Sequence, residues 1–104
     1  MIVTTGNEVA GRSIAKYLGV VRGIVVRSPT IGQGILGGIN QIFGGNIEAY
    51  AQVCEAARQE AYERMVGHAA EIGADAILGM RYDATEFSQG ATEVLAYGTA
   101  IRMA

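Results

Sequence analysis

The sequence predicts an α+β fold with the order β-β-α-β-β, in which one long amphipathic helix covers a mainly antiparallel sheet. Three observations support this prediction. Apolar, β-branched runs flank a single long stretch of helical periodicity, a glycine follows that stretch, and a turn signal separates the last two runs. At 104 residues the chain allows one domain, residues 1–104.

Two strands are expected before the helix. Residues 2–5 form a short strand that ends at a Gly-Asn turn, and residues 13–28 form a long strand that Pro29 stops. Glycines alternate with large residues in the long strand, which is typical of a bulge or of a closely approaching backbone. Both faces of this strand are apolar, so we expect both to be covered. We expect one face to carry Tyr17, Val21 and Val25.

The helix is expected over residues 47–73, with Asn46 as its N-cap and Gly73 at its end. Apolar residues recur at steps of three and four, and glutamates line another side, so the helix is amphipathic. The predicted apolar side consists of Tyr50, Val53, Cys54, Ala57, Ala61, Met65 and Ile72.

Two further strands, residues 74–87 and 92–103, follow the helix and form a hairpin through Ser88-Gln89-Gly90. The last strand is again apolar on both sides. A single helix shields only one face of a sheet, so the second face requires another subunit. Half of the residues are hydrophobic and only 17% are charged, which also favours self-association. We therefore expect a homo-oligomer that closes into a ring.

Charge and composition exclude several classes of partner. The net charge of −2 gives no general attraction to the phosphates of nucleic acid. No secretory leader and no apolar stretch of about 20 residues is present, so we expect a cytoplasmic protein with no membrane partner. A single cysteine agrees with a reducing compartment. The basic residues of the long strand and the acidic residues of the helix could dock between subunits, or could be solvated edges.

A glycine-rich segment, residues 28–46, contains the spacing G-x-G-x-x-G at Gly32, Gly34 and Gly37. A dinucleotide site requires a tight turn from a strand into a helix within a βαβ unit, and this chain offers none. The segment is better interpreted as an apolar connector, with one or two helical turns over residues 35–43, that packs against a neighbour. A nucleotide site and a membrane-contacting flap are the alternatives.

Residues that could bind a ligand are few. Cys54 and His68 are the main candidate metal ligands, but no C-x-x-C or H-x-x-H spacing supports them, and we expect Cys54 to lie in the core. Arg27, Tyr50 and Arg58 are candidate ligand-binding residues beside the connector. No catalytic residues are assigned, because no acid, base or nucleophile lies at a reachable spacing.

Four blocks of the sequence carry a resemblance to a known family. They are VTTGNEVAGRSIAKYLGVVRGIVVRS, FGGNIEAYAQVCEAARQEAYERM, GADAILGMRYD and EVLAYGTAIRM. Together they resemble the YbjQ-like family, small prokaryotic proteins of unassigned function with a heavy-metal-binding label that is itself an inference. The resemblance implies a β-β-α-β-β subunit assembled as a homopentamer. It implies no catalytic residues.

Three function classes follow from this reading. The first is a cytoplasmic ring that binds a small molecule or an ion at its subunit interfaces, with heavy-metal binding suggested by the resemblance alone. The second is a structural or interaction module without a ligand, and the third is an unrecognised enzyme. The sequence names no cofactor and does not identify the ligand.

Overall fold

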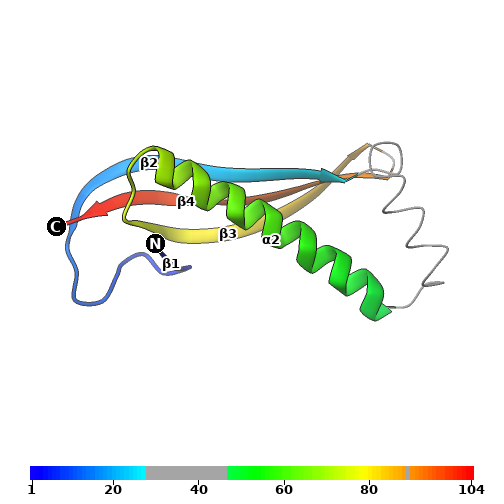
Figure 1. Cartoon of the computed structure of the whole chain (residues 1–104), viewed down its shortest axis with the longest axis horizontal. Helices are drawn as coiled ribbons and strands as arrows, with labels where there is room; N and C mark the ends of the chain where they lie inside the picture. Colours follow the sequence, from blue (N-terminus) through cyan, green and yellow to red (C-terminus); the bar gives the residue numbers. More distant parts are fainter. Residues whose placement is uncertain (28–46, 89) are drawn as a thin grey trace.

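A computed structural model describes residues 1–27, 47–88 and 90–104, with the backbone alone for residues 47–50. The described elements follow the predicted order β-β-α-β-β (Figure 1). They are β1 (Ile2–Val3), β2 (Ile14–Arg27), α2 (Ile47–Glu71), β3 (Ala76–Ser88) and β4 (Ala91–Met103). The connector, the proposed cap Asn46 and the turn residue Gln89 lie outside the described residues.

The four strands form one mixed sheet in the order β1-β3-β4-β2. β1 is parallel to β3, whereas β3, β4 and β2 are antiparallel to their neighbours. α2 runs obliquely across one face of this sheet (Figure 1). The predicted α+β fold, with one helix on the sheet, is therefore confirmed for the described parts of the chain. In those parts, no helix is both long and apolar enough to cross a membrane.

Gly73 ends the helix as predicted. It adopts the left-handed conformation, with φ 79°, which glycine enters without steric cost. The N–H of Ala74 donates to the carbonyl of Ala69 at 3.0 Å, and the N–H of Gly73 donates to the carbonyl of Ala70 at 3.1 Å. These two bonds satisfy carbonyl groups that the end of a helix would otherwise leave unpaired.

Two bulges in β2 change which side chains share a face. The register shifts between Ile14 and Lys16 and again between Tyr17 and Gly19, where Gly19 has φ 111°. An extra residue in one strand reverses the alternation of side chains beyond it. Tyr17 pairs with Ile101, and Val20 pairs with Thr99, so these two side chains share a face. The expectation that Tyr17 shares a face with Val21 and Val25 is wrong for this reason.

The hydrophobic core lies between α2 and the sheet. Its centre is a close contact between the helix backbone and β2 at Gly23. A Cβ atom on Gly23 would lie 2.5 Å from the amide nitrogen of Met65 and 2.8 Å from Cβ of Arg64. Only glycine allows this approach. The buried core residues around this contact are Val21, Val25, Ala57, Ala61, Met65, Ala69, Ile77, Met80, Val94, Ala96 and Ala100.

The apolar side of α2 is narrower than the sequence predicts. Ala57, Ala61 and Met65 are buried as expected, but Cys54 and Ile72 are exposed. Residues four apart lie on one line along a helix, and the line that meets the sheet continues from Met65 to the buried Ala69. The expectation that Cys54 belongs to the core is wrong, because its side chain lies beside this line.

The sheet face opposite α2, which we call the outer face, carries exposed apolar side chains. Tyr17 and Val20 are 66% and 67% exposed, and Ile24 and Val26 are each 38% exposed. They belong to one face because their partners on β4 are separated by even numbers of residues: Ile101, Thr99, Leu95 and Glu93. A smaller buried cluster, Ala76, Leu78 and Ile101, lies on the same face and is packed against Val9, Ile14 and Met103 of this chain. The helix therefore leaves this face uncovered as expected, but other parts of the same chain cover one end of it.

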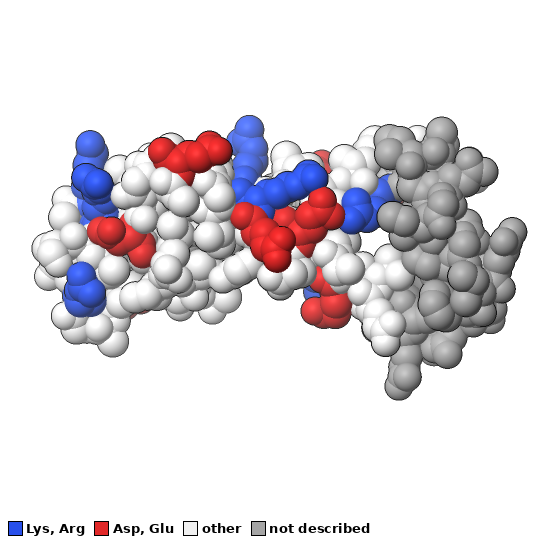
Figure 2. Space-filling model, viewed as in Figure 1, with Lys and Arg blue, Asp and Glu red and all other residues white. Residues whose placement is uncertain are grey.

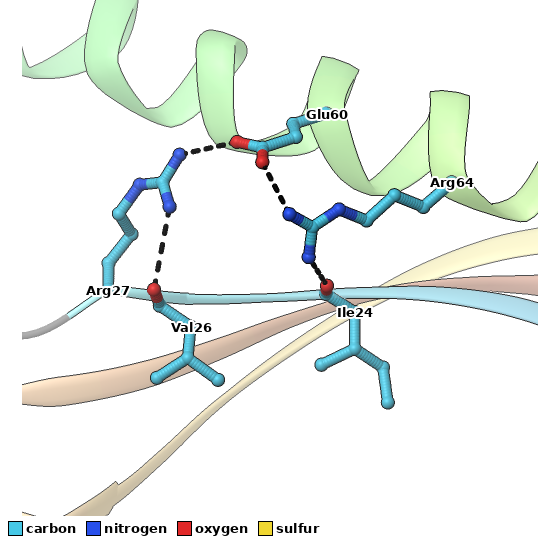
Figure 3. Close-up of polar contacts among 5 residues, drawn as sticks. All are labelled: Ile24, Val26, Arg27, Glu60 and Arg64. Carbon is cyan, nitrogen blue, oxygen red and sulfur yellow. Dashed lines mark hydrogen bonds and ion pairs between the residues drawn. The ribbon is translucent and has the colours of Figure 1, made fainter.

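Side chains of α2 also bind the free edge of β2. Arg64 donates to the carbonyl of Ile24 at 2.6 Å, and Nδ1 of His68 accepts from the N–H of Arg22 at 3.3 Å. Glu60 joins Arg64 (2.8 Å) to Arg27 (2.7 Å) through its two carboxylate oxygens (Figure 3). We call Arg27, Glu60 and Arg64 the edge clamp. It attaches the end of β2 to the middle of α2 and occupies backbone groups that would otherwise be open to another strand.

Replacing Gly23 with alanine is expected to lower the free energy of unfolding by about 1–3 kcal/mol, because the added methyl group meets the helix backbone. Gly67→Ala is the matched control. A Cβ atom at Gly67 meets nothing within 4 Å, so that variant should gain about 0.5–1 kcal/mol from helix propensity. Urea unfolding monitored by circular dichroism measures both changes. Equal stability of the two variants would contradict the close contact at Gly23.

The edge clamp should make stability depend on pH. The hydrogen bond from Arg27 holds the pKa of Glu60 below its ordinary value of 4.5. A carboxylate whose pKa is lowered in the folded state stabilises the protein at pH values above its ordinary pKa. This contribution is lost as the pH falls through the lowered pKa. The melting temperature of wild type should therefore exceed that of Glu60→Gln at pH 7, and the difference should shrink toward pH 3. Glu86→Gln controls for the loss of an exposed carboxylate as such. A difference that stays constant over this range would contradict the prediction.

Candidate functional site

The described part of the structure contains a cavity of about 310 Å³ between the first half of α2 and the sheet. Its lining comes from α2, the end of β2, the second half of β3 and the start of β4. Its lining residues are Arg27, Val53, Cys54, Ala57, Arg58, Ala84, Gly90, Thr92 and Val94.

Three of the candidate residues from the sequence, Arg27, Cys54 and Arg58, meet at this cavity. The helix contributes Cys54 and Arg58 because positions four apart project from the same side. β2 contributes Arg27, its last residue. The structure describes no side chain for Tyr50, which lies in the first turn of α2.

The walls of the cavity are mainly apolar. Ala57 and Val94 are buried members of the core, and Val53 is half-buried beside them. Thr92, which pairs with Arg27 across the sheet, contributes a hydroxyl group. Small-molecule sites commonly combine such apolar walls with a few polar groups that fix the orientation of the ligand.

The two arginines at the cavity have different partners. Arg27 is paired with Glu60 in the edge clamp and also donates to the carbonyl of Val26 at 3.4 Å (Figure 3). Arg58 is exposed, and its guanidinium lies over the ring of Tyr82, 5.7 Å from the ring centre. Within the described residues Arg58 makes no ion pair. The positive charge of Arg27 is therefore compensated, whereas that of Arg58 is held by an aromatic ring.

Tyr82 lies in β3 next to this site and is 42% exposed. Burial raises the pKa of its hydroxyl group above the ordinary value of 10.0, and Arg58 acts in the opposite direction. The phenol is therefore neutral at physiological pH. It supports Arg58 through the face of its ring and carries no charge that would neutralise the guanidinium.

The candidate metal ligands do not come together in one chain. Cys54 and His68 belong to one continuous helix, and a rise of 1.5 Å per residue puts them roughly 21 Å apart along its axis. His68 uses Nδ1 to accept the N–H of Arg22. Across residues 1–27, 47–88 and 90–104, no group of three or more His, Cys, Asp and Glu side chains is placed to hold a metal ion.

Sequence analysis missed Glu60 and Arg64. Their spacing of four residues is a visible helix signal for an ion pair. The partner of Glu60 on β2 had no such signal, because Arg27 is far away in the sequence. This contact joins the basic strand to the acidic helix inside one subunit, an arrangement that the sequence analysis did not consider. Figure 2 shows acidic and basic side chains gathered side by side over the middle of the molecule.

Comparison with known proteins gives consistent results. The model of the YbjQ family, described as "Putative heavy-metal-binding", matches residues 1–104. A UPF0145 protein of Legionella pneumophila (strain Corby) is 56% identical over 101 residues, which cover 97% of this chain and 96% of the relative. A UPF0145 protein of Chromobacterium violaceum is 52% identical over 102 residues, covering 98% and 87%.

A solved structure supports the fold alone. The crystal structure of a protein of unknown function of the DUF74 family from Pediococcus pentosaceus aligns with a TM-score of 0.65 and 20% identity. The alignment covers 100% of this chain and 98% of that one. The match of the family model over the whole sequence and the identity above 50% confirm the resemblance inferred from the four sequence blocks. The chain belongs to the YbjQ family, and the relatives of more than 50% identity described above are named UPF0145 proteins.

Proposed function

We propose that this protein is a ring-forming homo-oligomer, with a pentamer favoured, that binds a small molecule at sites near its subunit interfaces. The observation that carries the proposal is the cavity beside Arg27, Cys54 and Arg58. The cavity is mainly apolar, and of the two arginines that line it, Arg27 is in an ion pair whereas Arg58 has none among the described residues. Such a cavity is suited to binding and orienting a ligand.

The outer face supports the assembly. Tyr17, Val20, Ile24 and Val26 form a row of exposed apolar side chains on β2, at the edge of the sheet. Apolar surface of this kind is stabilised when a second copy of the chain covers it. In the homopentamer that the family resemblance implies, a neighbouring subunit would cover this face. The number of subunits comes from the resemblance alone.

Val20→Asp is the sharpest test of the assembly. Val20 is exposed in the isolated subunit, so an aspartate there is compatible with the fold. In a dry interface an unpaired charge costs about 3–5 kcal/mol, so the variant should dissociate at micromolar concentration. Light scattering and native mass spectrometry measure subunit number. Ala56→Glu, an exposed position on α2, is the control that should remain assembled. A monomeric wild type would contradict the ring.

A metal site that used both Cys54 and His68 would need these residues from different subunits. A metal ion needs donor atoms about 2.0–2.3 Å away, a distance that Cys54 and His68 of one chain cannot share on an unbroken helix. We therefore expect dialysed protein to retain no metal held jointly by these two residues within a subunit. Elemental analysis of wild type, Cys54→Ala and His68→Ala checks this expectation. One metal per subunit, lost in both variants from an intact assembly, would show that the two residues meet across an interface.

A further inference from the structure

The chemistry of the cavity restricts the class of ligand, if the proposed binding function is correct. The feature that decides the class is Arg58. Its guanidinium carries five N–H donors in a planar fork, and the only interaction recorded for it among the described residues is with the ring of Tyr82. Arg27, in contrast, is already paired with the carboxylate of Glu60. The cavity therefore presents one cationic donor group, Arg58, that forms no ion pair with a described carboxylate.

The rest of the lining is unsuited to a bare ion. Val53, Ala57 and Val94 provide apolar walls, and Thr92 is the one neutral polar side chain in the lining. A small inorganic anion needs several converging donors, because it loses its water on every side. A cation would be repelled by the guanidinium of Arg58, because the charge of Arg27 is already balanced by Glu60. Neither fits a cavity of this composition.

We propose that the cavity binds an amphipathic organic carboxylate, with the carboxylate held by Arg58 and the apolar body lying against Val53, Ala57 and Val94. A planar guanidinium binds a carboxylate through two parallel hydrogen bonds, which fixes the orientation of the ligand. The apolar body gains free energy by leaving water. Volume is sufficient, since about 310 Å³ corresponds to a small organic molecule.

The reactivity of Cys54 can report whether a ligand occupies the cavity. Cys54 is the single cysteine of the sequence, it is exposed, and it lines the cavity. Its thiolate attacks a sulfur of the neutral reagent dithiodipyridine, which forms a mixed disulfide and releases pyridinethiol as the leaving group. A ligand in the cavity covers the thiol and slows this reaction. The absorbance of the released product gives the rate.

The test compares acids with alcohols of the same apolar body: octanoate with octanol, and benzoate with benzyl alcohol. We expect the acids to slow the labelling of wild-type protein at roughly tenfold lower concentration than the alcohols, as one charge-assisted contact predicts. Arg58→Gln should abolish this preference, and Arg58→Lys should retain part of it. Arg12→Gln is the matched control, because Arg12 binds the carbonyl of Ala104 at the opposite end of the molecule (Figure 1).

The outcomes separate this inference from the proposed function. Equal protection of wild type by acids and alcohols would overturn the carboxylate class while leaving a binding cavity in place. A preference for acids that survives in Arg58→Gln would overturn the role of Arg58. Protection by none of the four compounds would overturn both the inference and the binding function proposed for this cavity. Melting temperatures within a few degrees of wild type establish that the variants are folded.

Discussion

The contact between the backbone of α2 and β2 at Gly23 is the constraint on which the rest of the structure depends. Gly23 has no side chain, and it faces a part of the helix that is rich in alanine. The two backbones therefore approach more closely than larger side chains would permit. Packing between close surfaces gains dispersion energy along the whole contact. It also fixes the position of the helix along the strand, because no larger residue can take the place of Gly23.

The cavity and the edge clamp are both consequences of this contact. The helix crosses the sheet obliquely, so its first half lies farther along toward the end of β2, where Val53 is only half-buried. Space therefore remains beside Ala57 and Val94. The same placement brings Glu60 within reach of Arg27 and Arg64 within reach of a free carbonyl of β2. One backbone contact thus positions both the apolar and the charged parts of the candidate site.

The elements were predictable because their signals are local. Periodicity, a terminal glycine and a turn suffice to place α2, β3 and β4, and the structure shifts their bounds by a few residues at most. Long-range features were less accessible. The bulge at Gly19 puts Tyr17 on the outer face of the sheet instead of the face that carries Val21 and Val25. No local sequence pattern specifies which residue of the strand is the extra one.

In the candidate site, too, local features were predictable from the sequence and long-range contacts were not. Arg27 and Arg58 were proposed as ligand-binding residues from the sequence, and both line the cavity. Cys54 also lines the cavity but was assigned to the core, because steps of three and four residues do not decide which of two neighbouring helix positions meets the sheet. The partner of Arg27 was invisible in the sequence, since it depends on how a distant helix lies on the strand.

The pairing of β2 with β4 has a consequence for the order of events during synthesis. Ile14 pairs with Met103, and Arg27 pairs with Thr92, so β2 is synthesised well before the strand that pairs with it. Until then both edges of β2 lack a strand partner, which is a state prone to aggregation. α2 emerges before β4, and its contact at Gly23 together with the bonds from Arg64 and His68 can shelter β2 in the meantime. The helix could thus protect β2 from aggregation until β4, which is translated later, pairs with it.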